Sequence, residues 1–129
     1  MALSITHIAL HVENLDTCIE FYQGFCELEI VHKRDSAAWL TNEALKNKFI
    51  IVLIKGGKKN KQKFKKDFSH IGIAVDSLEE LFKKVKEGKK LGCYAFGPFN
   101  EDYPTGHIAG FLDPNGNLVE LSYGQPIGL

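Results

Sequence analysis

Apolar and polar side chains alternate from Ser4 to Val12, as they do in a β-strand with one buried face. The apolar face holds Ile8, Leu10 and Val12, and the opposite face holds His7, Ala9 and His11. Apolar residues then recur every three or four positions from Leu15 to Tyr22, which is the spacing of a helix that buries one stripe. Asn14 or Asp16 can cap this helix and Gly24 can end it. We expect the helix to cover the apolar face of the strand.

The rest of the pattern predicts seven more strands and a second helix. Three strands are expected at Glu27 to Lys33, Ala37 to Leu40 and Lys48 to Lys55, with turns near Arg34-Asp35 and from Asn42 to Asn47. The next strand, Phe68 to Val75, is followed by a helix that Ser77 caps and Gly88 ends. A strand from Leu91 to Phe96, a loop from Gly97 to Gly106, and a hairpin of His107 to Leu112 with Asn117 to Tyr123 complete the chain. Each half is therefore predicted to have the order βαβββ.

The segment Thr6 to Leu15 has a second copy, Ser69 to Leu78, that aligns with it without a gap. Identical residues recur at His7/His70, Ile8/Ile71, Val12/Val75 and Leu15/Leu78. Such self-similarity indicates a duplicated module. We expect one α+β domain over 1–129, with a first module at 1–56, a linker at 57–66 and a second module at 67–129.

Composition narrows the class of protein without naming a function. The chain has 129 residues, of which 44% are hydrophobic, and its 16 basic and 16 acidic side chains balance. This charge balance gives no reason to expect binding to nucleic acid or to a membrane surface, and the basic run Lys55 to Lys66 is expected to be a solvated linker. The longest apolar run, Phe49 to Ile54, is far shorter than the roughly 20 residues of a membrane span. Three cysteines in no paired spacing, with no secretory signal, favour a cytoplasmic protein with reduced thiols.

Glu120 is the residue that points to a functional site. It lies between Val119 and Leu121 in a strand whose composition is that of a core, and burial of a carboxylate there costs several kcal/mol unless a partner compensates its charge. If the histidine-bearing faces of the two first strands line a cup, that partner is a cation held by His7, His70 and Glu120. Two imidazoles and one carboxylate suit Fe(II) or Mn(II), and also Zn(II) or Ni(II), with coordination positions open to a substrate.

These residues resemble those of the vicinal oxygen chelate superfamily, which includes glyoxalase I, extradiol dioxygenases, fosfomycin-resistance proteins and metal-free bleomycin-binding proteins. The resemblance rests on the histidines of THIALHV and SHIGIAV, on FYQG in the first helix, and on FLDPNGNLVELSYGQP, which contains Glu120. It implies two tandem βαβββ modules that form a curved mixed sheet around a cup with a metal ion. It also implies that the metal binds vicinal oxygen atoms of a small-molecule substrate, with His7, His70 and Glu120 as its protein ligands.

Departures from individual relatives leave several activities open. Val52 stands where glyoxalase I carries a fourth ligand, and Ala9 stands where fosfomycin-resistance proteins usually have a hydroxyl. Phe49 and Gly110 stand near the positions of the acid–base histidine and tyrosine of extradiol dioxygenases. His107 or Tyr103, and also His11, are candidates to replace those groups in proton transfer.

We therefore expect a metal-dependent lyase or dioxygenase with glyoxalase-like or dioxygenase-like chemistry. The alternative is a non-catalytic protein of the antibiotic-resistance type that sequesters a small molecule in the same cup. By analogy with small members of the superfamily, a homodimer is expected. Five aromatic side chains are candidates to line the cup, and although most of them are expected to belong to the core, one or two could bind an apolar or aromatic part of the substrate: Trp39, Phe49, Tyr94, Phe96 and Phe99.

Overall fold

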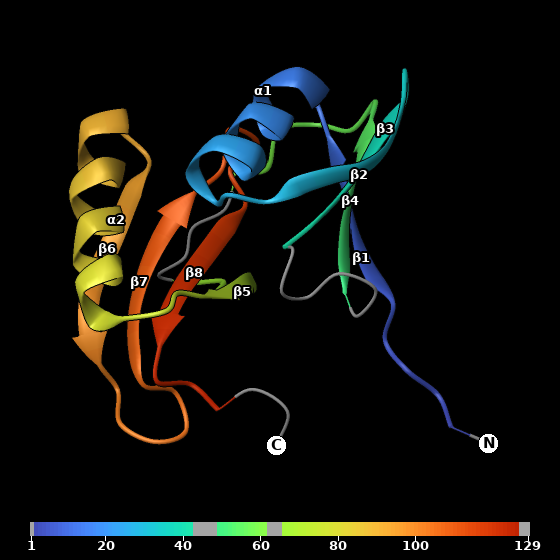
Figure 1. The fold of residues 1–129 in the computed structure, drawn as a ribbon. Helices are drawn as coiled ribbons and strands as arrows, with labels where there is room; N and C mark the ends of the chain where they lie inside the picture. The colour runs from blue at the N-terminus through green and yellow to red at the C-terminus, as the bar shows by residue number, and fades with distance from the viewer. Residues whose placement is uncertain (1, 43–48, 62–65, 127–129) are drawn as a thin grey trace. The chain divides into compact units, whose positions relative to one another are not determined.

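The computed structural model describes residues 2–42, 49–61 and 66–126, and the chain divides into two compact units, Met1–Asn60 and Lys61–Leu129. Each unit contains one four-stranded mixed sheet (Figure 1). The expected turn from Asn42 to Asn47 lies almost entirely outside the described residues, as do the start of the strand expected at Lys48 and part of the linker at 57–66.

The first unit has the predicted order of a strand, a helix and three strands. Its elements are β1 (His7–Val12), α1 (Leu15–Glu20), the π-helical turn η1 (Phe21–Phe25), β2 (Glu29–Arg34), β3 (Ala37–Thr41) and β4 (Ile50–Lys55). The strands lie in the order β1-β4-β3-β2. β1 runs parallel to β4, and the other pairs are antiparallel. β1 is therefore an edge strand of its sheet.

α1 begins as the sequence indicates, because the side chain of Asn14 accepts a hydrogen bond from the backbone amide of Thr17. Gly24 does not end the helical segment, which continues through η1 to Phe25. The wider turn of η1 buries both Tyr22 and Phe25 in the core. α1 packs against β3 and β4, and of the expected apolar face of β1 only Val12 is fully buried.

The second unit repeats this order. Its elements are β5 (His70–Ala74), α2 (Leu78–Leu91), β6 (Tyr94–Asn100), β7 (His107–Leu112) and β8 (Leu118–Tyr123). The strands lie in the order β5-β8-β7-β6, with β5 parallel to β8. Figure 1 shows α2 running along this sheet, where it packs against β6, β7 and β8. The predicted α+β fold of two tandem βαβββ modules is confirmed.

The end of α2 differs from the prediction. Ser77 caps the helix by accepting a hydrogen bond from the amide of Glu80, but the helix ends at Gly92, whose φ of 79° is left-handed, and not at Gly88. A Cβ at Gly88 would collide with the buried ring of Phe111 on β7. Gly88 is thus required for close packing of the helix on the sheet. The sequence pattern had instead predicted that Gly88 ends the helix.

The following strand was predicted too early in the chain. Because α2 includes Leu91, β6 starts only at Tyr94 and extends through Asn100, into the segment expected to be a loop. Its pairing with β7 shifts register twice, between Tyr94 and Phe96 and between Phe96 and Phe99. These irregularities hide the alternation that a regular strand would show in the sequence.

Strand register places Glu120 on the face of the second sheet that α2 does not cover. Glu120 pairs with Gly72 on β5 and with Gly110 on β7. The neighbouring positions Val119 and Phe111 point to the opposite face, where Phe111 meets α2 at Gly88. No helix among the described residues is long and apolar enough to cross a membrane.

Candidate functional site

The turn between β7 and β8 fixes the register that positions Glu120. One carboxylate oxygen of Asp113 accepts hydrogen bonds from the backbone amides of Asn115 (2.8 Å) and Asn117 (2.9 Å). Its other oxygen accepts from the side-chain amide of Asn117 at 3.1 Å. Gly116 takes a left-handed φ of 82°, which a side chain would disfavour. These hydrogen bonds stabilise the Asp-Pro-Asn-Gly-Asn turn of the hairpin that carries Glu120.

His70 and Glu120 form a close pair within the second unit. His70 lies two positions before Gly72, the parallel partner of Glu120, so both side chains lie on the same face of the sheet. The distance from His70 Nε2 to Glu120 Oε2 is 3.2 Å. A Cβ at Gly72 would meet no atom within 4 Å, so the face beside Glu120 has open space at this position. The structure thus brings together two of the three side chains expected to bind a metal.

The ring of His70 is oriented by its own strand. His70 Nδ1 lies 2.6 Å from the backbone carbonyl oxygen of Phe68. Because a carbonyl oxygen only accepts, Nδ1 is the donor and carries a proton. A contact of Nε2 with the carboxylate then requires one more proton, on either Nε2 or Glu120. A divalent cation bound by both groups would take the place of that shared proton.

The environment of Glu120 disfavours its charge. The residue is only 5% exposed. Burial raises the pKa of its carboxyl group, and the nearby His70 opposes this shift by favouring the carboxylate. A bound cation would strongly stabilise the charged form of a buried carboxylate that has a single imidazole beside it.

His7 is the equivalent of His70 in the first unit. It lies two positions before Ala9, which pairs in parallel with Val52. The hydroxyl oxygen of Thr6 is 2.8 Å from His7 Nδ1, so in both histidines Nδ1 is engaged and coordination would use Nε2. Among the described residues no three His, Cys, Asp or Glu side chains gather as a metal site. The role of His7 as a third ligand stays a prediction from the repeat.

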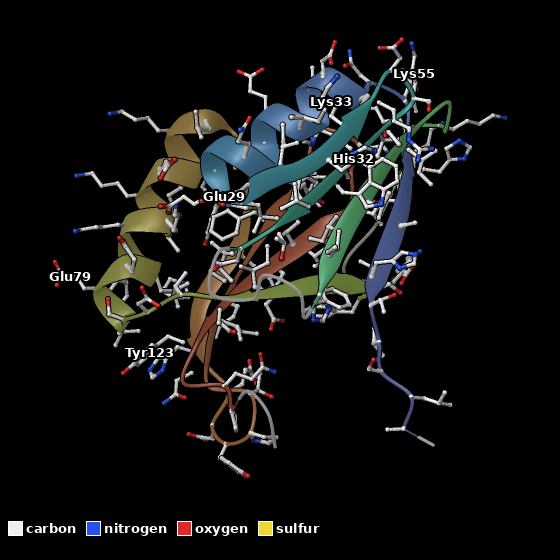
Figure 2. The ribbon with its side chains drawn as sticks, turned by 45° about the vertical axis from the view of Figure 1, so that its right-hand side comes forward. Glu29, His32, Lys33, Lys55, Glu79 and Tyr123 are labelled. Carbon is white, nitrogen blue, oxygen red and sulfur yellow. The ribbon has the colours of Figure 1, made fainter. Side chains whose placement is uncertain are left out.

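The candidates for proton transfer lie on three different segments of the chain: His107 on β7, Tyr103 in a turn and His11 on β1. His107 pairs with Tyr123 and points to the opposite face of the sheet from Glu120, with the two rings 6.4 Å apart (Figure 2 labels Tyr123). Tyr103 is 78% exposed in the turn between β6 and β7. His11 lies on β1 in the first unit, on the same face as His7. Their roles in proton transfer stay predictions.

A chain of three aromatic rings leads away from His70 on its side of the sheet. The ring of Phe68 meets His70 edge to face at 5.2 Å and Phe96 at 5.5 Å, and Phe96 stacks on Phe99 at 6.1 Å. Phe96 and Phe99 were expected to line a cup, whereas Phe68 was missed. Its position two residues before His70 could have indicated it, because strand alternation places the two on one face.

Trp39, another of the expected aromatic residues, has a different setting in the first unit. Its ring lies 5.0 Å from that of His32 on β2, and the guanidinium group of Arg34 lies 5.3 Å from its centroid (Figure 2 labels His32). Tyr94 packs edge to face against Phe111, on the face of the second sheet that α2 covers, and it is half-buried there. Phe49 is half-buried just before β4.

Comparison with known proteins supports the family resemblance. Residues 4–121 match the model of the glyoxalase/bleomycin resistance protein/dioxygenase superfamily. An uncharacterized protein of Pseudomonas aeruginosa is 37% identical over 99% of this chain and 94% of its own length. A probable trivalent organoarsenical cleaving enzyme of Bacillus subtilis is 29% identical over 94% of this chain and 80% of its own length.

Among solved structures, a similar fold occurs in the fosfomycin resistance protein FosX of Listeria monocytogenes, in a complex with Mn(II) and sulfate. It has a TM-score of 0.77 and 21% identity, and the match covers 97% of this chain and 93% of that protein. The match of the family model over most of the chain decides the assignment. The chain belongs to the glyoxalase/bleomycin resistance protein/dioxygenase superfamily.

Proposed function

We propose that this protein is a divalent-metal-dependent enzyme that acts on a small molecule with two adjacent oxygen atoms. The metal ligands in this proposal are His7, His70 and Glu120. The observation that carries it is the contact of 3.2 Å between His70 Nε2 and the buried carboxylate of Glu120. His7 enters the proposal through its repeat equivalence to His70.

The donor set fits a divalent transition metal. Imidazole nitrogen and carboxylate oxygen are common ligands of Fe(II), Mn(II), Zn(II) and Ni(II), and two histidines with one carboxylate leave positions open. The hydrogen bond from Nδ1 of His70 to the carbonyl of Phe68 is the kind of support that metal-bound histidines usually have. It holds the ring with Nε2 toward Glu120.

The side chains around the pair have separate tasks in this proposal. A bound metal would supply Lewis acidity, polarising an oxygen atom of the substrate. His70 and Glu120 hold the ion, and the Phe68 carbonyl sets the orientation and protonation of the His70 ring. The hydrogen bonds of the Asp113 turn fix the hairpin that carries Glu120, which supports its placement as a ligand.

Relatives support metal-dependent chemistry in general rather than one reaction. A structure of FosX contains Mn(II), and the Bacillus subtilis relative is named a probable trivalent organoarsenical cleaving enzyme. Fold alone does not determine the reaction, because one fold supports many activities. We therefore propose a metal-dependent enzyme with glyoxalase-like or dioxygenase-like chemistry.

Metal titration of matched histidine variants tests the proposal. The purified protein, stripped of metal, is titrated with Mn(II) and Co(II), and the bound ion is counted by elemental analysis. We expect about one ion per chain, and a loss of affinity of more than about 100-fold in His70→Ala, since changes to supporting residues alone cost about 10- to 100-fold. His107→Ala removes a histidine from the same sheet but from the opposite face, and should keep its affinity.

Equal affinity in wild type and His70→Ala would overturn the proposal. If no ion binds to the wild type, the non-catalytic binding protein becomes the leading function. Circular dichroism of both variants establishes that any loss of affinity is local.

A further inference from the structure

The strongest unassigned feature of the second unit is the group of phenylalanine rings beside His70. We propose that Phe68, Phe96 and Phe99 form a subsite for a planar aromatic group of the substrate, next to the metal-binding pair. This inference rests on the proposed function and adds to it the chemical class of the substrate: an aromatic compound whose ring carries, or adjoins, two oxygen atoms.

Position and exposure both point to a ligand rather than to a core. Phe68 is 49% exposed and Phe99 is 51% exposed, although large apolar side chains gain free energy from burial. They are linked through Phe96, which contacts both rings, and Phe68 contacts the imidazole of His70. Each ring therefore contacts the next, from the imidazole of His70, which would bind the metal, to Phe99.

Gly110 makes room for the central ring of the three, that of Phe96. A Cβ at Gly110 would overlap the ring of Phe96, so the ring lies directly against the backbone of β7. Gly110 is also the strand partner of Glu120. The ring of Phe96 can lie next to Glu120 because Gly110 has no side chain at this position.

The geometry of the rings suits an aromatic ligand better than an aliphatic one. Phe68 meets its neighbours edge to face, with interplanar angles of 65° to His70 and 70° to Phe96, whereas Phe96 and Phe99 lie nearly parallel at 9°. Both arrangements are favoured between aromatic rings because of their quadrupoles. An additional ring can contact exposed Phe68 and Phe99 in the same two ways, a preference that a saturated chain lacks.

Two hydroxamates with the same chelating group provide the test. Benzohydroxamate carries a phenyl ring, and acetohydroxamate carries a methyl group in its place. Each is titrated into the Co(II)-loaded full-length protein, and the visible spectrum reports binding. We expect wild type to bind benzohydroxamate about tenfold more tightly, which corresponds to about 1.4 kcal/mol. In Phe68→Ala and Phe99→Ala this preference should fall to about twofold or less, and in Phe99→Ala the acetohydroxamate affinity should be unchanged.

Phe82→Ala is the matched control. Phe82 lies on α2 in the same unit and is 53% exposed, close to the value for Phe99. Its removal deletes an equally exposed ring at a different place, and the preference for the phenyl ring should stay about tenfold. Phe99→Leu, which keeps bulk without aromaticity, is the second variant, and it should lose most of the preference while folding as the wild type does.

Titrations of the metal-free protein test the aromatic subsite independently of metal binding. Aromatic NMR signals of Phe68 and Phe99 are followed in protein without metal, as millimolar benzohydroxamate or acetohydroxamate is added. Shifts with benzohydroxamate alone support the subsite, even if the loaded protein shows no chelation, in which case only the proposed function fails. Chelation of both hydroxamates with equal affinity, or the absence of any phenyl preference in both arms, overturns the subsite.

Discussion

Val52 and Glu120 occupy equivalent positions in the two sheets. Val52 pairs in parallel with Ala9, and Glu120 pairs in parallel with Gly72, the repeat equivalent of Ala9. Of these two positions only Glu120 offers a metal ligand, because the side chain of valine has no donor atom. On the proposed function, the first unit must therefore contribute through its histidine, which stands two positions before Ala9 on the same face.

This asymmetry predicts different effects for the two histidines of β1. His7→Ala should weaken Mn(II) or Co(II) binding by more than about tenfold, because a ligand to the ion is lost. His11→Ala is the matched control: its side chain lies on the same strand face but about 13 Å further along. Its metal affinity should match that of the wild type in the same titration. A similar loss in both variants, or none in either, would contradict the assignment of His7.

Glu120→Gln should separate metal binding from folding. The amide is a poor metal ligand, so affinity should fall by more than about 100-fold, whereas the metal-free variant should be at least as stable as the wild type at neutral pH. Burial raises the pKa of Glu120, which means that the fold disfavours its carboxylate. Chemical denaturation of both proteins without metal measures the difference in the free energy of unfolding.

The pH dependence follows from the sign of that shift. A carboxyl group with a raised pKa stabilises the fold below the ordinary range for glutamate, around pH 4 to 5, and this contribution is lost as pH rises through the raised pKa. Stability of metal-free wild type should therefore fall relative to Glu120→Gln as pH rises from that range to neutrality. A difference that is constant with pH would show that the charge of Glu120 does not matter to the fold.

Features that depend on neighbouring residues in the chain could be predicted from the sequence, whereas features that depend on contacts between distant residues could not. The order βαβββ and the equivalence of His7 with His70 follow from alternation and from a repeat, which are both visible along the chain. The end of α2 was misplaced because Gly88 is there to admit Phe111, a residue of another strand. Phe68 was overlooked for a similar reason, since its importance comes from its contacts with His70 and Phe96.

Gly88→Ala should be destabilising although alanine is the better helix former. The new Cβ would collide with the ring of Phe111, which is fully buried and closely packed, and overpacking of this kind costs about 1–3 kcal/mol. Gly24→Ala is the control, because a Cβ there meets no atom within 4 Å. Thermal denaturation should give a lower midpoint for Gly88→Ala and an unchanged or higher one for Gly24→Ala.

We expect the protein to be a homodimer in solution. Leu3 and Ile5 are 88% and 77% exposed in the segment before β1, which is an edge strand, and apolar side chains beside a strand edge favour pairing with another chain. A symmetric dimer is the commonest assembly of this kind. Light scattering at micromolar concentration should give twice the chain mass, and Leu3→Asp with Ile5→Asp should lower it. A monomer mass for the wild type would contradict the expectation.

Open coordination positions on the metal would distinguish an enzyme from a binding protein. Three protein ligands leave about three positions on a six-coordinate ion, enough for two adjacent oxygen atoms of a substrate. Catechol should therefore change the visible spectrum of the Co(II)-loaded protein, whereas phenol, which has the same ring and one oxygen, should have a much weaker effect. His70→Ala should abolish the change, and His107→Ala should retain it. If catechol and acetohydroxamate both leave the spectrum unchanged while one Co(II) is bound, the ion has no open positions, and a structural metal in a binding protein would explain it.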